Sequence, residues 1–249
     1  MNTRKFIFDF EDGDGKDKML LGGKGANLCE MTQIGLNVPP GFTITTEACL
    51  AYLERNQLPE GLMEDIKARI KALEKKTGKG FGSADNPLLV SVRSGSAMSM
   101  PGMMDTILNL GLNEVSLKGL IKLTANARFA WDAYRRFIQL FGKIALGIAD
   151  EAFDEKMHAV KKKYGALQDV DLSAEHLQEL AGEFLSIVQR HTGKPFPADP
   201  YEQLEIAVGA VFRSWMGKRA VDYRKQFRIT REMANGTAVN VCTMVFGNM

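Results

Sequence analysis

The stretch VSVRSGSAMSMPGMMDTILNLGLN, residues 90–113, joins a β-strand pattern to a loop rich in serine, glycine and methionine. The aliphatic run LLVSV (88–92) predicts a strand that delivers Arg93 into this loop. A guanidinium placed there can bind two phosphate oxygens at once, and the backbone N–H groups of the loop can add further contacts. The stretch therefore predicts a loop suited to a triphosphate at the end of a strand.

The methionines of this loop do not follow the spacing of a helical core: they are Met98, Met100, Met103 and Met104. Methionine packs well on flat or mobile apolar surfaces, so these side chains are suited to an adenine face or to a moving partner. The alternative is that Met103 and Met104 fill a gap in the core. Asp105 and Thr106 are candidates to contact phosphate or metal, or to cap a following helix.

A second glycine-rich segment, LLGGKGANL (20–28), places Gly22, Gly23 and Gly25 around Lys24. Glycine allows close backbone approach, and the helical pattern that follows offers N–H groups and a lysine to a phosphate. The segment is not a Walker loop, because Gly25 stands where that motif requires Ser or Thr. A glycine-rich turn with a solvated lysine is the alternative, and it is the commoner case for GGKG alone.

The pattern along the chain predicts the fold class α/β (α+β). Short apolar runs at 6–10, 41–45 and 88–92 predict strands, and amphipathic stretches at 26–34, 46–55 and 61–75 predict helices. Long helical patterns fill 116–189, the proline-rich stretch 191–200 predicts a linker, and 201–218 predicts a return helix.

The last residues, TAVNVCTMVFGNM (237–249), predict a strand covered on both faces. Val239, Val241 and Val245 are expected on one face, and Cys242, Met244 and Phe246 on the other. Because chain ends usually lie at exposed, weakly packed positions, we expect the sequence to be cut from a longer chain.

Composition indicates a globular chain with no polyanionic partner. The 249 residues are 45% hydrophobic and 25% charged with a net charge of +2, so nucleic acid is not an expected ligand. No apolar stretch approaches the roughly 20 residues of a membrane helix, and the start lacks a secretory signal core. Cys29, Cys49 and Cys242 lack the number and spacing of a disulfide framework or zinc site, which favours a reducing, cytoplasmic location.

Several segments, in order, resemble the pyruvate, phosphate dikinase family: GGKGANL (22–28), VPPGFTITTEA (38–48), residues 88–113, RFAWDAYRRFIQLFG (128–142), AVFRSW (210–215) and GTAVNVCTMVFGN (236–248). PGMMDT (101–106) is the discriminating piece, because phosphoenolpyruvate synthases look different there. The resemblance implies the N-terminal part of an ATP-grasp domain with an inserted helical subdomain. The expected divisions are an α/β part at 1–112, helices at 113–197, and a return to the α/β part at 198–249.

The resemblance implies a phosphoryl transfer in which ATP phosphorylates a histidine, orthophosphate takes part, and AMP and pyrophosphate leave. The phosphohistidine then converts pyruvate to phosphoenolpyruvate. Lys24 and Arg93 would hold the ATP phosphates, and the loop from Ser94 to Thr106 would close over them. The other positions implied at the nucleotide are Gly22, Gly23, Gly102, Met103 and Asp105. Magnesium would accompany ATP, with ligands expected downstream of Met249.

The implied partners are a phosphohistidine domain and a pyruvate-binding domain of the parent chain, and the parent is expected to be a homo-oligomer. Four arginines are candidates for docking these domains, unless they are solvated or paired with carboxylates: Arg135, Arg136, Arg213 and Arg219. The histidines lack the Gly/Thr-rich context of the phosphorylated residue and are expected to be surface or structural: His158, His176 and His191. No catalytic residue is therefore expected in this sequence.

The motifs and the resemblance lead to one hypothesis about function and two alternatives. We expect the chain by itself to bind ATP weakly or not at all and to catalyse no turnover, because metal ligands and half of the clamp are expected elsewhere. Another dikinase of the superfamily, such as a phosphoenolpyruvate synthase or a glucan dikinase, is one alternative. A non-catalytic module that binds nucleotide or a protein partner is the other.

Overall fold

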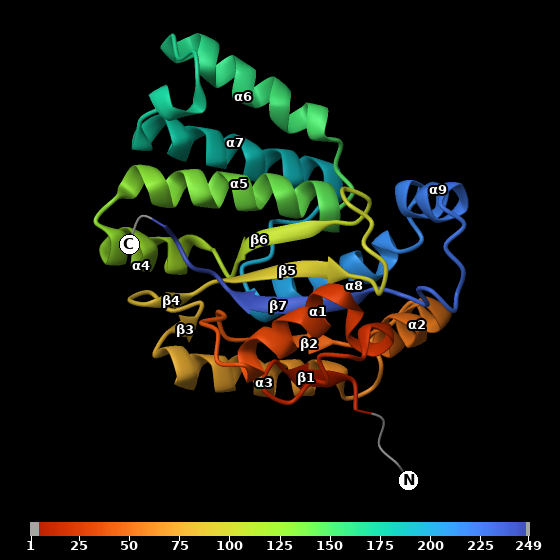
Figure 1. Ribbon diagram of the computed structural model, residues 1–249. Helices are drawn as coiled ribbons and strands as arrows, with labels where there is room; N and C mark the ends of the chain where they lie inside the picture. The colour runs from red at the N-terminus through yellow and green to blue at the C-terminus, as the bar shows by residue number, and fades with distance from the viewer. Residues whose placement is uncertain (1–4, 248–249) are drawn as a thin grey trace.

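The computed structural model describes residues 5–247 as a mixed α/β fold built on an antiparallel sheet (Figure 1). The predicted mixture of helices and strands is confirmed. In chain order the elements are β1 (Ile7–Asp9), α1 (Lys18–Gln33), β2 (Gly41–Ile44), α2 (Thr46–Arg55), α3 (Leu62–Thr77), β3 (Gly80–Phe81), β4 (Pro87–Leu88), β5 (Val90–Gly95), β6 (Thr106–Leu110), α4 (Glu114–Thr124), α5 (Ala127–Ala145), α6 (Asp150–Tyr164), the short 3-10 helix η1 (Asp169–Asp171), α7 (Ala174–Thr192), α8 (Pro200–Ser214), α9 (Lys218–Gln226) and β7 (Ala238–Thr243).

The main sheet has the strand order β1-β2-β7-β5-β6, and every neighbouring pair is antiparallel. The strand predicted near the end of the chain is therefore confirmed as β7, which pairs with β2 on one side and β5 on the other. It is shorter than predicted. β7 ends at Thr243, and Val245 is 72% exposed, so the expectation that Val245 shares a buried face with Val239 and Val241 is wrong.

Helices cover both faces of this sheet. In Figure 1, α1 lies in front of the strands and α8 lies behind them, and both helices pack on β5 and β7. Val239 and Val241 of β7 and Phe212 of α8 are fully buried. Because β7 is buried on both faces, its sequence is mostly apolar and does not alternate between polar and apolar residues.

A separate layer of helices extends from the β6 edge of the sheet, as predicted for 116–189. α5 packs on β6, α7 packs on α5, and α6 packs on α7 (Figure 1). Phe137, Phe141 and Phe196 form an edge-to-face aromatic cluster where α5 meets the segment that leads into α8. None of the helices formed within residues 5–247 combines the length and apolar character that a membrane span requires.

One predicted helix boundary is wrong, and the helix-capping alternative for Asp105 and Thr106 does not hold. The helix expected at 26–34 begins at Lys18, where Asp17 caps it by accepting a hydrogen bond from Leu20 N at 2.9 Å, and it is interrupted at Gly22. Residues 106–110 form strand β6, so Asp105 and Thr106 do not cap a helix. The next helix, α4, is capped instead by Asn113, whose side chain accepts from the first turn.

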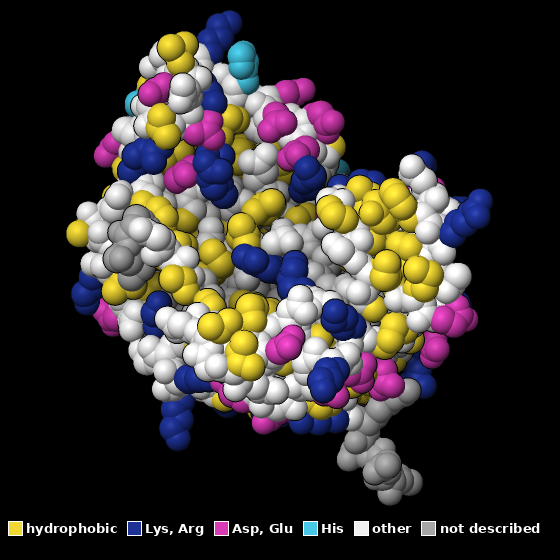
Figure 2. Space-filling model, in the orientation of Figure 1, with side chains coloured by type: hydrophobic (Ala, Val, Ile, Leu, Met, Phe, Trp, Pro, Cys, Tyr) yellow, Lys and Arg dark blue, Asp and Glu magenta, His cyan; other side chains and the backbone are white. Residues whose placement is uncertain are grey.

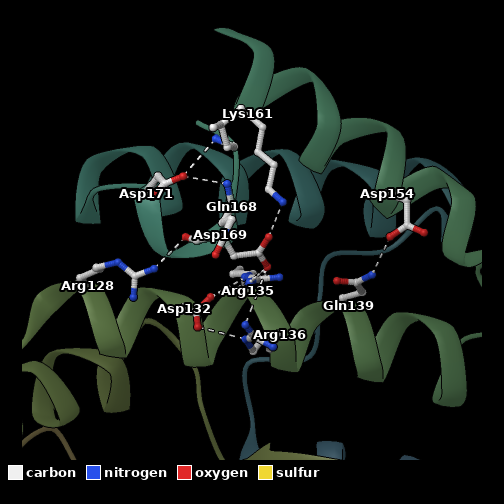
Figure 3. Close-up of polar contacts among 11 residues, drawn as sticks. Arg128, Asp132, Arg135, Arg136, Gln139, Asp154, Lys161, Gln168, Asp169 and Asp171 are labelled. Atoms are coloured by element: carbon white, nitrogen blue, oxygen red, sulfur yellow. Dashed lines mark hydrogen bonds and ion pairs between the residues drawn. The ribbon is translucent and has the colours of Figure 1, made fainter. Parts of the chain in front are cut away.

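Arg135 is buried inside the helical layer, which contradicts its predicted role on a docking rim. Its guanidinium donates to Asp132 at 2.7 Å and to Asp169 at 2.6 Å, and the residue is 3% exposed (Figure 3). Its neighbour Arg136 is exposed but contacts the same two carboxylates. With Lys161, these side chains fasten the connection between α6 and α7 onto α5.

The histidines have the structural or surface placements that were expected. His158 and His191 are exposed, and His176 stacks on Tyr164 with ring centroids 3.6 Å apart. The three cysteines are free thiols: Cys29 and Cys49 are buried, and Cys242 is partly buried.

Candidate functional site

The two glycine-rich segments predicted to bind phosphate touch each other through their backbones. Gly22 interrupts α1 with φ 68° and ψ 160°, and a Cβ on it would stand 2.1 Å from the carbonyl oxygen of Gly95 at the end of β5. The N–H of Gly23 donates to the carbonyl of Ser96 at 2.8 Å. Glycine is required at position 22 both by its positive φ and by this close approach. The contact fixes the resumed part of α1 against the loop that follows Arg93.

A row of polar side chains crosses the sheet beneath α1. Strand register pairs Thr43 of β2 with Asn240 of β7, Asn240 with Arg93 of β5, and Arg93 with Thr106 of β6. Directly paired residues project from the same face of a sheet, so these four side chains lie in one line. A Cβ on Gly25 would stand 2.8 Å from Asn240 Oδ1, so α1 lies directly over the row.

Lys24 and Arg93 approach each other at this place. The pKa of Lys24 is lowered, first because its surroundings partly desolvate the ammonium and second because Arg93 is positively charged. Part of the Lys24 side chain still reaches solvent. Burial raises the pKa of the Cys242 thiol to about 11, against the opposing effect of Arg93 and Lys24. Neither Lys24 nor Arg93 forms an ion pair within residues 5–247. Two neighbouring cations without a counterion form a site suited to an anion.

A cavity of about 660 Å³ opens beside these cations, within the size range of small-molecule sites. Figure 2 shows basic side chains gathered in the hollowed centre of this face. The cavity is lined by Lys18, Gly23, Lys24, Asn27, Leu28, Met31, Ser94, Gly95, Ser96, Ala97, Met98, Ser99, Met100, Pro101, Gly102, Met104 and Thr106. This lining combines cations, serines and backbone with an apolar methionine wall, and it includes no described carboxylate. The arrangement can therefore hold a polyanion joined to a flat apolar group.

Comparison with known proteins identifies the family. The family model described as "Pyruvate phosphate dikinase, AMP/ATP-binding domain" matches residues 18–68 and 57–249. The chain belongs to this family. The resemblance inferred from the sequence motifs is thereby confirmed.

Curated pyruvate, phosphate dikinases match almost the whole chain. The protein of Entamoeba histolytica is 59% identical over 244 residues, which cover 98% of this chain and 28% of that protein. The protein of Giardia intestinalis is 49% identical over 254 residues, covering 100% of this chain and 28% of that protein. The protein of Rhizobium meliloti is 48% identical over 250 residues, covering 98% and 28% respectively. The chain thus spans a little over a quarter of the length of the dikinases that it matches.

The structure brings together most of the residues that the dikinase resemblance implied at the nucleotide. Those that line the cavity are Gly23, Lys24, Ser94, Gly102 and Thr106. Gly22 supports the cavity from beneath through its contact with Gly95, and Arg93 lies in the polar row next to the lining residue Ser94.

Met103 and Asp105 lie outside the lining. Met103 and Met104 both pack against the hydrophobic core, as the core-filling alternative supposed, and Met104 also lines the cavity together with Met98 and Met100. Asp105 accepts from Arg219 Nη2 at 3.0 Å, and Arg219 also reaches the carbonyl of Gly102 at 3.4 Å. Arg219 therefore ties α9 to the outer side of the loop.

The remaining docking candidates lie away from this cavity. Arg213 is exposed on α8 and donates to the hydroxyl of Tyr52. Arg135 and Arg136 belong to the ion-pair cluster of the helical layer.

Three polar residues of this candidate site were missed from the sequence: Lys18 and Asn27 on α1, which line the cavity, and Asn240 on β7, which lies in the polar row. Lys18 was missed because the helix was expected to begin at residue 26, whereas Asn27 stood in the glycine-rich segment but was not singled out. Asn240 had a usable signal, since an amide within the apolar run TAVNVC is unusual in a strand buried on both faces. Strand register was needed to place it beside Arg93.

Proposed function

We propose that the chain is the ATP-binding part of a pyruvate, phosphate dikinase. The parent enzyme would transfer phosphate from ATP through a phosphohistidine to pyruvate, with orthophosphate as co-substrate, giving phosphoenolpyruvate, AMP and pyrophosphate. The observation that carries this proposal is the approach of Lys24 to Arg93, without a counterion, beside a cavity lined by the two glycine-rich segments. Family membership adds support, because the matching family model is described as AMP/ATP-binding.

The described side chains suit the separate parts of a nucleotide. The ammonium of Lys24 and the guanidinium of Arg93 would neutralise phosphate oxygens, and the guanidinium can bind two of them at once. The N–H groups of the loop 94–102 would add donors, while Met98, Met100 and Met104 would pack on the adenine ring. Phosphoryl transfer depends mainly on such positioning and charge neutralisation.

The described residues do not supply a site for magnesium. No group of three His, Cys, Asp or Glu side chains within residues 5–247 could hold a metal ion. Asp105, the nearest candidate from the sequence, is ion-paired with Arg219. We therefore propose only that Mg²⁺ arrives with ATP, and we assign none of its ligands to these residues.

We also propose that the chain forms part of an ATP-grasp domain. In this proposal a helical subdomain spans residues 113–197, and the chain divides at 112 and 197. The proposed partners are the phosphohistidine and pyruvate-binding domains of the parent chain. We propose further that the parent is a homo-oligomer and that it is cytoplasmic. Arg213 and Arg219 are exposed and stay candidates for docking, and Arg219 is the better placed because it contacts the loop beside the cavity.

Titration of the chain with MgATP, followed by backbone amide NMR, tests the proposal. We expect weak binding, with a dissociation constant on the order of 1 mM, because this is only part of the parent's nucleotide site. The amides that shift should belong to the cavity lining, including Gly23, Ser96 and Gly102. Shifts confined to other surfaces, or no shifts at all, would contradict the proposed function.

A further inference from the structure

Asn240 lies in the polar row beneath α1, and one end of its amide lacks a partner. The residue is fully buried on β7, and its Oδ1 accepts a hydrogen bond from Thr43 Oγ1 at 2.9 Å. This bond directs the other end of the amide, Nδ2, away from β2. Nδ2 has no hydrogen-bond partner among the described residues. A buried donor without an acceptor costs free energy, so each such group requires an explanation.

A second unpaired donor lies next to it. Arg93 is the cross-strand partner of Asn240, and its Nε is also buried without an acceptor among residues 5–247. Two donors cannot satisfy each other. An acceptor that enters from outside would satisfy both, because the register places the two side chains side by side on one face.

The amide nitrogen lies directly behind the cavity wall, where only a glycine leaves room for it. A Cβ on Gly95 would stand 2.8 Å from Asn240 Nδ2 and 3.4 Å from Lys24 Cβ. Gly95 and Lys24 both line the cavity. The Asn240 amide thus lies against the wall residue Gly95, close to Lys24, with Arg93 as the neighbouring strand residue. An acceptor with several charged oxygens, such as a polyphosphate, matches this set of donors.

We propose that Asn240 is a further binding residue of this site, and that its Nδ2 donates to an oxygen of the same polyphosphate that Lys24 and Arg93 bind. Thr43 acts as a positioning residue, because its hydroxyl holds the amide in the donating orientation. This inference rests on the proposed function and adds to it a residue pair that none of the glycine-rich motifs contains.

The direct test follows the side-chain NH₂ signals of Asn240 by NMR while tripolyphosphate is added to the chain. The signals are assigned by their absence from the spectrum of N240D, which keeps the size of the side chain and an acceptor for Thr43. We expect both NH₂ signals to shift with the same midpoint as the backbone amide of Ser96. Unmoved Asn240 signals, with Ser96 shifting, would overturn this inference and leave the proposed function standing. If neither shifts, both fail.

Two substitutions at Thr43 give a second readout that does not require changing Asn240. Thr43→Val keeps the β-branched shape but removes the hydroxyl, so we expect tripolyphosphate affinity to fall about fivefold. Thr43→Ser keeps the hydroxyl and should bind within about twofold of the unsubstituted chain. Asn240→Ala should bind about tenfold more weakly. If Asn240 only braces the sheet, Thr43→Val and Asn240→Ala would lower stability in urea but leave affinity within about twofold, which would overturn the proposal.

Discussion

Replacing Arg93 with methionine should weaken the binding of tripolyphosphate to the chain by roughly 30-fold, measured at low ionic strength. Each charge-assisted hydrogen bond to a charged ligand is worth about 1.5–3 kcal/mol, and 2 kcal/mol corresponds to roughly 30-fold in affinity. The same change removes the unpaired Nε and the repulsion between Arg93 and Lys24. Stability in urea should therefore be retained, which separates a role in binding from a role in folding.

Two control variants make this result specific. Arg213→Met removes the same charge from α8, away from the cavity, and should change affinity less than threefold, an order-of-magnitude expectation for an exposed charge. Arg93→Lys keeps the charge but loses the planar fork, so its affinity should fall between those of Arg93→Met and the unsubstituted chain. Equal losses of affinity for Arg93→Met and Arg213→Met would contradict a specific role of Arg93, because affinity would then depend only on the net charge of the chain.

Replacing Arg135 with alanine should lower the free energy of unfolding by about 3 kcal/mol, measured by urea denaturation. Removal of one partner from a buried ion pair is strongly destabilising, and here both carboxylates lose their buried counterion. Arg135 is 3% exposed and bridges Asp132 on its own helix to Asp169 in the connection between α6 and α7 (Figure 3). Its loss also leaves a cavity under η1.

The neighbouring arginine supplies the matched control. Arg136 contacts the same carboxylates, but its side chain is 53% exposed, so Arg136→Ala should cost less than about 1 kcal/mol. If Arg136→Ala lowered the free energy of unfolding as much as Arg135→Ala, burial would not be the reason for the effect of Arg135.

The effect of Arg135→Ala should also depend on pH. Burial would raise the pKa of Asp169, but hydrogen bonds from Lys161 and Arg135 outweigh it, and the pKa is lowered below 3.8. Stability from a lowered carboxyl pKa is present above the unfolded value and lost as pH falls through the folded value. The difference between Arg135→Ala and the unsubstituted chain should therefore shrink below about pH 4.

The sequence was sufficient to predict the parts of the site that rest on local patterns. A strand leading to Arg93 was correctly expected from the aliphatic run LLVSV, but β5 continues to Gly95, so Arg93 lies within the strand and not in the loop after it. The phosphate-binding candidates Lys24 and Arg93 were expected to approach each other only through the family resemblance. The backbone contact between Gly22 and Gly95, which brings them together, joins residues far apart in the chain.

Other features could not be predicted, because they depend on tertiary packing. Residues 106–110 have an ambiguous pattern and become a strand since β5 offers them a pairing edge, with Asn109 in a left-handed conformation (φ 60°) beside a register shift. The burial of Arg135 depends on Asp169, 34 residues away along the chain. Asn240 could be recognised as a site residue only from the strand registers, which place it between Thr43 and Arg93.

The proposed site requires Lys24 and Arg93 to bind the same anion, and the pKa of Lys24 measures this most directly. NMR titration of the lysine side chain should give a pKa below the ordinary value of 10.5 in the free chain. Because an anion favours the charged lysine, tripolyphosphate should raise this pKa, and affinity should fall as pH rises through it. Arg93→Met should also raise the pKa in the free chain, since it removes the neighbouring positive charge. A Lys24 pKa that changes neither with tripolyphosphate nor with Arg93→Met would contradict a shared site.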